Sequence, residues 1–142
     1  MNFYHTERAD SFEQYARHRQ IPCVMLGTIS EEPQDSRGHN RLADNVVDQF
    51  VKLSPRPDGL FVANDLGYFV HQQLRQRGIV PMRDFFYICG DREVAYQQME
   101  PPPVKVDIHS YEIGRLAVEV LIMRLANLDA PRITQMIEPT LI

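Results

Sequence analysis

Two polar residues that each follow an apolar run, Asn64 and Asp91, are the side chains of this sequence best suited to bind a small molecule. Residues 56–66 place turn residues before Leu-Phe-Val-Ala and end in Asn-Asp-Leu, and residues 85–91 are Phe-Phe-Tyr-Ile-Cys-Gly-Asp. An asparagine amide donates and accepts hydrogen bonds, whereas an ionised aspartate only accepts them. Ligands of open α/β sheets bind at the carboxyl edge of the strands, so the pair predicts a site for a hydroxyl-rich molecule.

The same two positions also have purely structural interpretations. Asn64 or its neighbour Asp65 could cap the following helix by accepting hydrogen bonds from its first amides. Asp91 follows Gly90 and could be a turn residue. A cap and a ligand contact can coexist in the Asn64-Asp65 pair, one for each residue, so these alternatives stay open.

The other reactive side chains form no pattern that predicts catalysis or metal binding. The histidines have no H-x-x-x-H spacing and the cysteines no C-x-x-C spacing, so we expect no metal site. There is no Gly-rich phosphate loop and no G-x-S-x-G motif, and we predict no catalytic residue and no cofactor. We expect His18 and His71 on solvated helix faces, and Cys23 and Cys89 as buried free thiols in strands.

Alternating helix and strand patterns position the two candidate residues. Apolar residues at helical spacing predict helices over 7–19, 40–53 and 66–77, and short apolar runs predict strands over 22–27, 60–63 and 85–89. Gly78 is expected to end the third helix in the left-handed conformation. Short connections between alternating elements predict an α/β fold, a parallel sheet with helices on both faces.

The last third of the sequence departs from this alternation. Pro101-Pro-Pro103 cannot be helical. After it we predict a strand over 104–108, a long helix over 110–127 and a final strand over 133–138. At the other end, Phe3-Tyr4 could be the tail of a strand.

Composition sets broader limits on function. A chain of 142 residues with 44% hydrophobic and 24% charged residues is expected to form one globular domain. Its net charge of −4 argues against nucleic-acid binding by this segment alone. No apolar run approaches the roughly 18 residues of a membrane span, and residues 1–8 show no signal-peptide pattern, so a cytoplasmic location is expected.

Six motifs in one order and spacing resemble the effector-binding domain of the LacI/GalR transcriptional regulators. The resemblance extends from about Arg8 to the end of the chain, and xylose-responsive activators with an AraC-type DNA-binding region share it. The motifs are residues 56–66, 77–81, 88–91, 101–106, 113–121 and 138–142. The resemblance implies one lobe of a type I periplasmic-binding-protein-like fold, with the effector bound between two lobes.

The resemblance also implies how the chain is divided. Residues 1–108 correspond to the C-terminal lobe, 109–130 to a helix of an N-terminal lobe mostly absent from this chain, and 131–142 to the returning strand. Because the 110–127 helix carries many apolar side chains, we expect it to dock on the remaining lobe or to pair with another chain, for example by domain swapping.

Individual site residues follow from the resemblance. Asn64 and Asp91 match residues that contact a sugar or related polar effector. Arg8 is the nearest match to an effector-binding arginine, although Ser11 stands where the family has glycine. The loop over 29–39 is expected to line the pocket. Cys89-Gly90 replace a Gly-aromatic pair, which removes a ring that could stack on a sugar.

The function implied is the effector-binding and dimerisation portion of a sugar-responsive transcriptional regulator. Operator DNA would be bound only through a region absent from this chain, and no membrane contact is expected. The helix after the A-N-D motif is expected to contribute to a homodimer interface through Leu66, Tyr68, Phe69, Val70 and Leu74.

Two other classes of protein fit the sequence less well. A solute-binding protein of a sugar transport system would need an export signal and normally lacks the A-N-D and P-P-x-T-x-V combination. The other class is a small α/β enzyme or a phospho-receiver domain. A receiver would need acidic residues and a lysine at particular strand ends, and neither Lys52 nor Lys105 lies at such an end.

Overall fold

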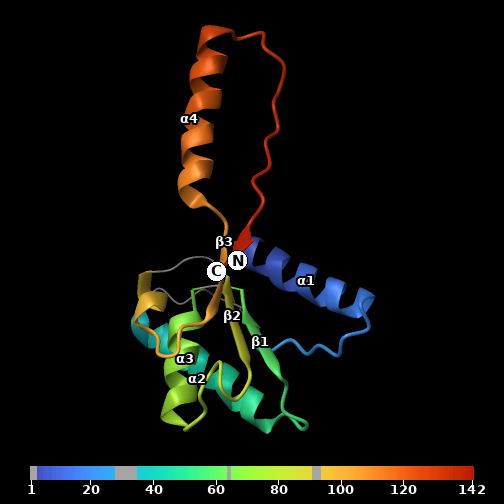
Figure 1. The fold of residues 1–142 in the computed structure, drawn as a ribbon, viewed down its shortest axis with the longest axis vertical. Helices are drawn as coiled ribbons and strands as arrows, with labels where there is room; N and C mark the ends of the chain where they lie inside the picture. Colours follow the sequence, from blue (N-terminus) through green and yellow to red (C-terminus); the bar gives the residue numbers. More distant parts are fainter. Residues whose placement is uncertain (1–2, 28–34, 64, 91–93) are drawn as a thin grey trace.

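A computed structural model describes residues 3–27, 35–63, 65–90 and 94–142 of the chain. Its elements alternate along much of the sequence (Figure 1). They are α1 (Phe3–His18), α2 (Ser36–Lys52), β1 (Gly59–Val62), α3 (Gly67–Gln76), β2 (Phe86–Gly90), the 3-10 helix η1 (Val94–Gln98), β3 (Val104–Asp107), α4 (Ser110–Ala126) and β4 (Thr140–Leu141). All the predicted helices are present.

The sheet has the order β1-β2-β3-β4, with β1, β2 and β3 parallel and β4 antiparallel to β3. The register aligns Val62 with Cys89, so β1 and β2 end at the same edge of the sheet. This mostly parallel sheet with packed helices confirms the predicted α/β fold.

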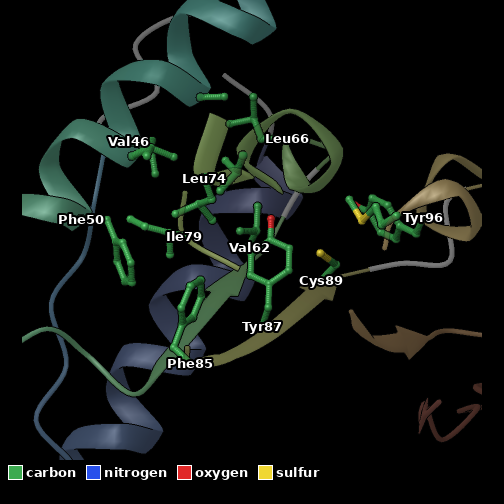
Figure 2. Packing of buried hydrophobic residues seen from close by; sticks show 14 residues of the cluster. Val46, Phe50, Val62, Leu66, Leu74, Ile79, Phe85, Tyr87, Cys89 and Tyr96 are labelled. Carbon is green, nitrogen blue, oxygen red and sulfur yellow. The ribbon is translucent and has the colours of Figure 1, made fainter. Parts of the chain in front are cut away.

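The main core lies between one face of the sheet and helices α2 and α3 (Figure 2). Asp35 caps α2 by accepting a hydrogen bond from the Gly38 amide at 2.7 Å. The core side chains recur at helical spacing on α2 and α3 and at every second position of the strands. They include Ala43, Val46, Val47, Phe50, Val62, Val70, Leu74, Tyr87 and Cys89.

Helix α1 lies on the opposite face of the sheet. Phe61 alternates with the core residue Val62 along β1 and therefore points away from the core. Its ring stacks on Phe12 of α1, with ring centroids 5.0 Å apart. The neighbouring strand is less covered, since Phe86 of β2 is 68% exposed.

Helix α4 projects away from the sheet, and residues 127–139 return beside it to β4 (Figure 1). No residue of α4 is buried, and Leu121 and Leu125 are 57% and 68% exposed. The expectation that this helix docks on the remaining lobe is therefore wrong. Pairing with another chain stays a prediction.

Two predicted strands are absent where the structure describes the chain. Residues 22–27 and 133–138 have no regular secondary structure, and the returning strand forms instead at Thr140–Leu141. Apolar runs give a segment strand propensity, but a strand exists only where a neighbour accepts its hydrogen bonds. Phe3 and Tyr4 belong to helix α1 rather than to a strand, and η1 was not predicted.

Some predictions for single residues are confirmed and others are wrong. Cys89 is a buried free thiol as predicted, whereas Cys23 is exposed because its segment joins no sheet. His18 is exposed as predicted, but His71 is buried, since it lies on the inner face of α3 beside Val70. Gly78 has a φ of +73°, as expected for a left-handed helix end.

Candidate functional site

The ends of β1 and β2 approach each other closely at one edge of the sheet. A Cβ atom on Gly90 would lie 3.1 Å from the Ala63 carbonyl oxygen and 3.2 Å from its carbon. Glycine at position 90 therefore lets the two strand ends pack with their backbones in contact. We call this edge, formed by Ala63 and Gly90, the rim.

Arg8 reaches the rim from α1. Its Nη1 donates a hydrogen bond to the Ala63 carbonyl at 3.3 Å, and the residue takes part in a further interaction. The stacked pair of Phe12 and Phe61 holds α1 against β1 one helical turn further along. The structure thus brings a guanidinium group, with its fixed fork of donors, to the end of β1.

Asn64 and Asp91, the two predicted ligand contacts, lie outside the described residues. In the sequence they follow Ala63 and Gly90 directly. The structure therefore shows that their strands end at a common edge, with Arg8 at the same place. The positions of the two side chains remain a prediction, and so does the contribution of the loop over 29–39, most of which is also not described.

Asp65 does not cap α3. The N-cap position is Leu66, which makes no side-chain capping hydrogen bond. The Asp65 carboxylate instead contacts His39 of α2, with 3.1 Å between Oδ2 and Nε2. The other ring nitrogen, Nδ1, lies 2.8 Å from the Asp35 carbonyl oxygen. Both partners of the ring are acceptors, so both contacts are hydrogen bonds when the imidazole carries two protons.

A hollow of about 370 Å³ lies where α2, α3 and η1 begin. It combines two carboxylates with aromatic rings, and the His39 ring stacks on Phe69 with centroids 5.1 Å apart. It is lined by Asp35, Ser36, His39, Asp65, Tyr68, Phe69 and Ala95. His39 ends the loop over 29–39 that was expected to line the pocket, but its contact with Asp65 was not predicted, because the two residues are 26 positions apart and no local motif links them.

The predicted dimer residues on α3 divide into two groups. Leu66, Val70 and Leu74 are buried in the core of the chain itself. The prediction is corrected for these three, because their side chains already pack against α2 and the sheet. Tyr68 and Phe69 are half-buried, line the hollow and remain accessible to another chain.

The described part of the chain offers no group of three or more His, Cys, Asp or Glu side chains that could hold a metal ion. Within the same residues, no helix is both long enough and apolar enough to cross a membrane.

Comparison with known proteins places this geometry in a family. A family model described as a periplasmic binding protein-like domain matches residues 2–142. Among solved structures, the chain is similar to a LacI-type transcription regulator from Bifidobacterium animalis subsp. lactis, at 23% identity and a TM-score of 0.72. That match covers 95% of this chain and 47% of the other. No match was found among the curated proteins.

Two further similar structures hold a sugar. One is the transcriptional regulator CelR in complex with cellobiose, at 19% identity and a TM-score of 0.75, covering 96% of this chain and 41% of that chain. The other is a LacI family regulator from Enterococcus faecium with bound ribose, at 16% identity and a TM-score of 0.76. That match covers 96% of this chain and 49% of the other.

These structures share the fold with this chain, which spans between 41% and 49% of their length. Two of the three are described as LacI-type or LacI family transcription regulators and the third as a transcriptional regulator. The family match over residues 2–142, together with the mostly parallel sheet, shows that this chain belongs to the periplasmic binding protein-like domain family.

Proposed function

We propose that this chain is the effector-binding portion of a sugar-responsive, LacI-type transcriptional regulator and that it contributes to a homodimer in the cytoplasm. The observation that carries the proposal is the contact of Arg8 with the Ala63 carbonyl, beside the close approach of Gly90. It brings a hydrogen-bond donor to the strand ends that immediately precede Asn64 and Asp91.

The chemistry of these groups suits a polyhydroxylated effector. Guanidinium, amide and carboxylate groups together offer donors and acceptors for several neighbouring hydroxyls. The similar structures with cellobiose and ribose support a sugar as the class of ligand. Cys89-Gly90 place no aromatic ring at the end of β2, so we expect hydrogen bonds rather than ring stacking to hold the sugar.

The mechanism follows from a two-lobed arrangement. An effector that contacts both lobes favours one relative orientation of them, and that orientation sets the spacing of DNA-binding regions in a dimer. In this chain the net charge is −4, so operator DNA is proposed to be bound by other parts of a longer regulator. The xylose-responsive, AraC-type subgroup is not part of the proposal, because two of the similar structures are described as LacI-type regulators.

A half-cleft should bind its ligand weakly. Good small-molecule sites bury 70–90% of the ligand, which one lobe alone does not achieve. For the isolated chain we therefore expect a Kd on the order of 1 mM or weaker for a monosaccharide.

A titration with ribose and with cellobiose, followed by amide chemical shifts, tests the proposal. We expect progressive shifts at the amides of Ala63, Asp65 and Gly90. Asn64→Ala and Asp91→Ala should each reduce these shifts at least tenfold. Asn127→Ala and Asp129→Ala change the same residue types at the far end of α4 and should leave the titration unchanged.

Two results would count against this assignment. Shifts confined to residues away from the rim would show that the sugar binds elsewhere. Submicromolar binding would show that the chain forms a complete cleft without a second lobe.

For the dimer we propose the surface around Tyr68 and Phe69, where the starts of α2 and α3 meet. Both side chains are aromatic and half-buried, as is common at the centre of protein interfaces.

A further inference from the structure

We infer that Gly67, Cys89 and Tyr96 form a buried positioning device that fixes the spacing of the two strand ends at the rim. The role of this device rests on the proposed function, since the rim is where the effector is proposed to bind. The contacts themselves do not depend on any ligand.

Gly67 lies directly against the side chains of Cys89 and Tyr96. A Cβ atom on Gly67 would lie 2.6 Å from the Tyr96 Oη, 2.7 Å from the Cys89 Sγ and 2.9 Å from the Tyr96 Cζ. Cys89 and Tyr96 are completely buried. Neither side chain can yield without disturbing the core, so this arrangement requires glycine at position 67.

Polar groups line up beside this contact. The Tyr87 hydroxyl donates to the Gly67 carbonyl oxygen at 2.7 Å, and Cys89 lies between the side chains of Tyr87 and Tyr96, which completes a row of three polar groups (Figure 2). Burial raises the pKa of the Cys89 thiol to about 12, so it keeps its proton.

The position of this row in the sequence lets it couple the two strand ends. Gly67 begins α3 and follows position 64 by three residues, whereas Cys89 precedes position 91 by two. Tyr96 belongs to η1, which follows position 91. Figure 2 shows Cys89 between Tyr87 and Tyr96. The row therefore ties together the chain segments that bracket both expected ligand residues.

A buried row of three polar groups is costly unless every member is satisfied. Apolar side chains at these positions would pack equally well without needing hydrogen-bond partners. Satisfied rows instead hold their members at defined distances and angles. This directional constraint is what distinguishes a positioning role from simple filling of space.

Substitutions at Cys89 separate these two roles. We expect Cys89→Ala to break the row and to speed hydrogen exchange about tenfold at the amides of Ala63, Asp65 and Gly90. Cys89→Ser preserves a donor and an acceptor, so exchange at those amides should return towards the wild-type rates. Cys89→Val fills the space without a polar group, so it should accelerate exchange as alanine does if the row acts through its polar groups. Wild-type exchange in Cys89→Val would show that the residue only fills space.

Tyr96→Phe provides a second variant that keeps the ring in place. We expect rim exchange to accelerate severalfold with a melting temperature within about 5 °C of wild type, as the loss of one hydrogen bond implies. Tyr111→Phe is the matched control, because Tyr111 is 81% exposed on α4, and it should change neither quantity.

Gly67→Ala tests the close packing directly. We expect a lower melting temperature and shifted rim amides, with partial recovery when Cys89→Ala and Tyr96→Phe are added to relieve the contacts. Gly114→Ala is its control, since a Cβ there meets no atom within 4 Å. Unchanged rim amides in Gly67→Ala, or rim amides equally insensitive to all Cys89 variants, would overturn the inference.

These measurements need no ligand, so they stand apart from the test of the proposed function. If the rim responds to the substitutions but wild-type protein shows no sugar-dependent shifts, the device exists and the proposed effector site is wrong. If the sugar binds the rim and Cys89→Ala leaves both exchange and binding unaltered, the effector site stands and the device is wrong.

Discussion

At the scale of single residues, His71 is the buried side chain, among the described residues, with a nitrogen atom that lacks a hydrogen-bond partner. Its Nε2 has no partner, while a hydrogen bond joins the ring to the Pro101 carbonyl. Burial lowers the pKa of His71 below 6.5, the Arg75 charge acts in the same direction, and the bond to Pro101 opposes them. The folded state therefore prefers the neutral ring.

This preference makes stability depend on pH in a defined direction. Because the folded pKa is depressed, the unfolded chain binds more protons, and stability is greatest above the unfolded pKa of about 6.5. It should decline as the pH falls from 6.5 through the lower folded pKa. We expect the melting temperature to drop between pH 7.5 and pH 5.

His71→Gln should flatten this pH dependence, at the expense of some stability at neutral pH, about 1–3 kcal/mol for a poorly satisfied buried amide. His18→Gln, on the exposed side of α1, should leave the pH profile unchanged. Thermal denaturation of the three proteins from pH 5 to pH 7.5 makes the comparison. An equal pH dependence in wild type and His71→Gln would contradict this account.

The position of His71 could have been predicted. Residues 67, 70, 71 and 74 fall on one side of a helix, and that side is the buried one. The common edge at which β1 and β2 end was also predicted, and the register of the two strands confirms it. The His39–Asp65 contact and the packing around Gly67 were out of reach, because they depend on distances between segments that no local pattern encodes.

At the scale of elements, α2 and α3 are joined on their outer side by a forked ion pair. Arg77 Nη2 lies 2.5 Å from Asp44 Oδ1 and 2.7 Å from Asp48 Oδ1. The two carboxylates come from successive turns of α2, so both face one guanidinium. They are about half exposed, and solvent screening limits what each pair contributes.

We expect Arg77→Ala to destabilise the chain by about 0.5–1.5 kcal/mol, and Asp44→Ala or Asp48→Ala by less, because the remaining carboxylate still pairs. Arg115→Ala is a suitable control, since Arg115 bridges Glu112 and Glu119 within the exposed helix α4. Urea denaturation of single and double variants gives the coupling energies. Additive losses for the two aspartates would show that the fork does not act as a unit.

Sequence periodicity predicted the helices better than the strands, for a physical reason. Helices α2, α3 and α4 were predicted to within a few residues, because helical hydrogen bonds are local and their apolar pattern repeats within one segment. Residues 22–27 and 133–138 have equally suitable composition, yet they lack a paired neighbour in the described structure. Strand formation depends on that neighbour, which the sequence of the segment does not contain.

At the scale of the whole molecule, α4 leaves a large apolar surface in water. Its exposed side chains include Ile113, Val118, Leu121, Ile122, Met123 and Leu125. Burying a large apolar side chain contributes about 1.5–3 kcal/mol, so a partner that covered this helix would be strongly favoured. Exposed patches of this kind mark interaction sites or cause association.

We therefore expect the isolated chain to self-associate as its concentration rises. Leu121→Glu combined with Leu125→Glu should shift the sedimentation equilibrium towards the monomer by at least tenfold in Kd. Val94→Glu, at a 73% exposed apolar residue of η1, should have little effect. A wild-type chain that stays monomeric at high concentration would contradict the expectation.

The attachment of this long helix has a mechanical consequence. Outgoing β3 and returning β4 lie side by side, and Lys105 and Ile142 exchange two backbone hydrogen bonds of 2.8 and 2.9 Å. Two adjacent strands resist rotation of α4 about its own axis, whereas a single connecting strand would allow that rotation. A force on the far end of α4 should therefore reach the sheet as hinge bending, in a direction set by the plane of the strand pair.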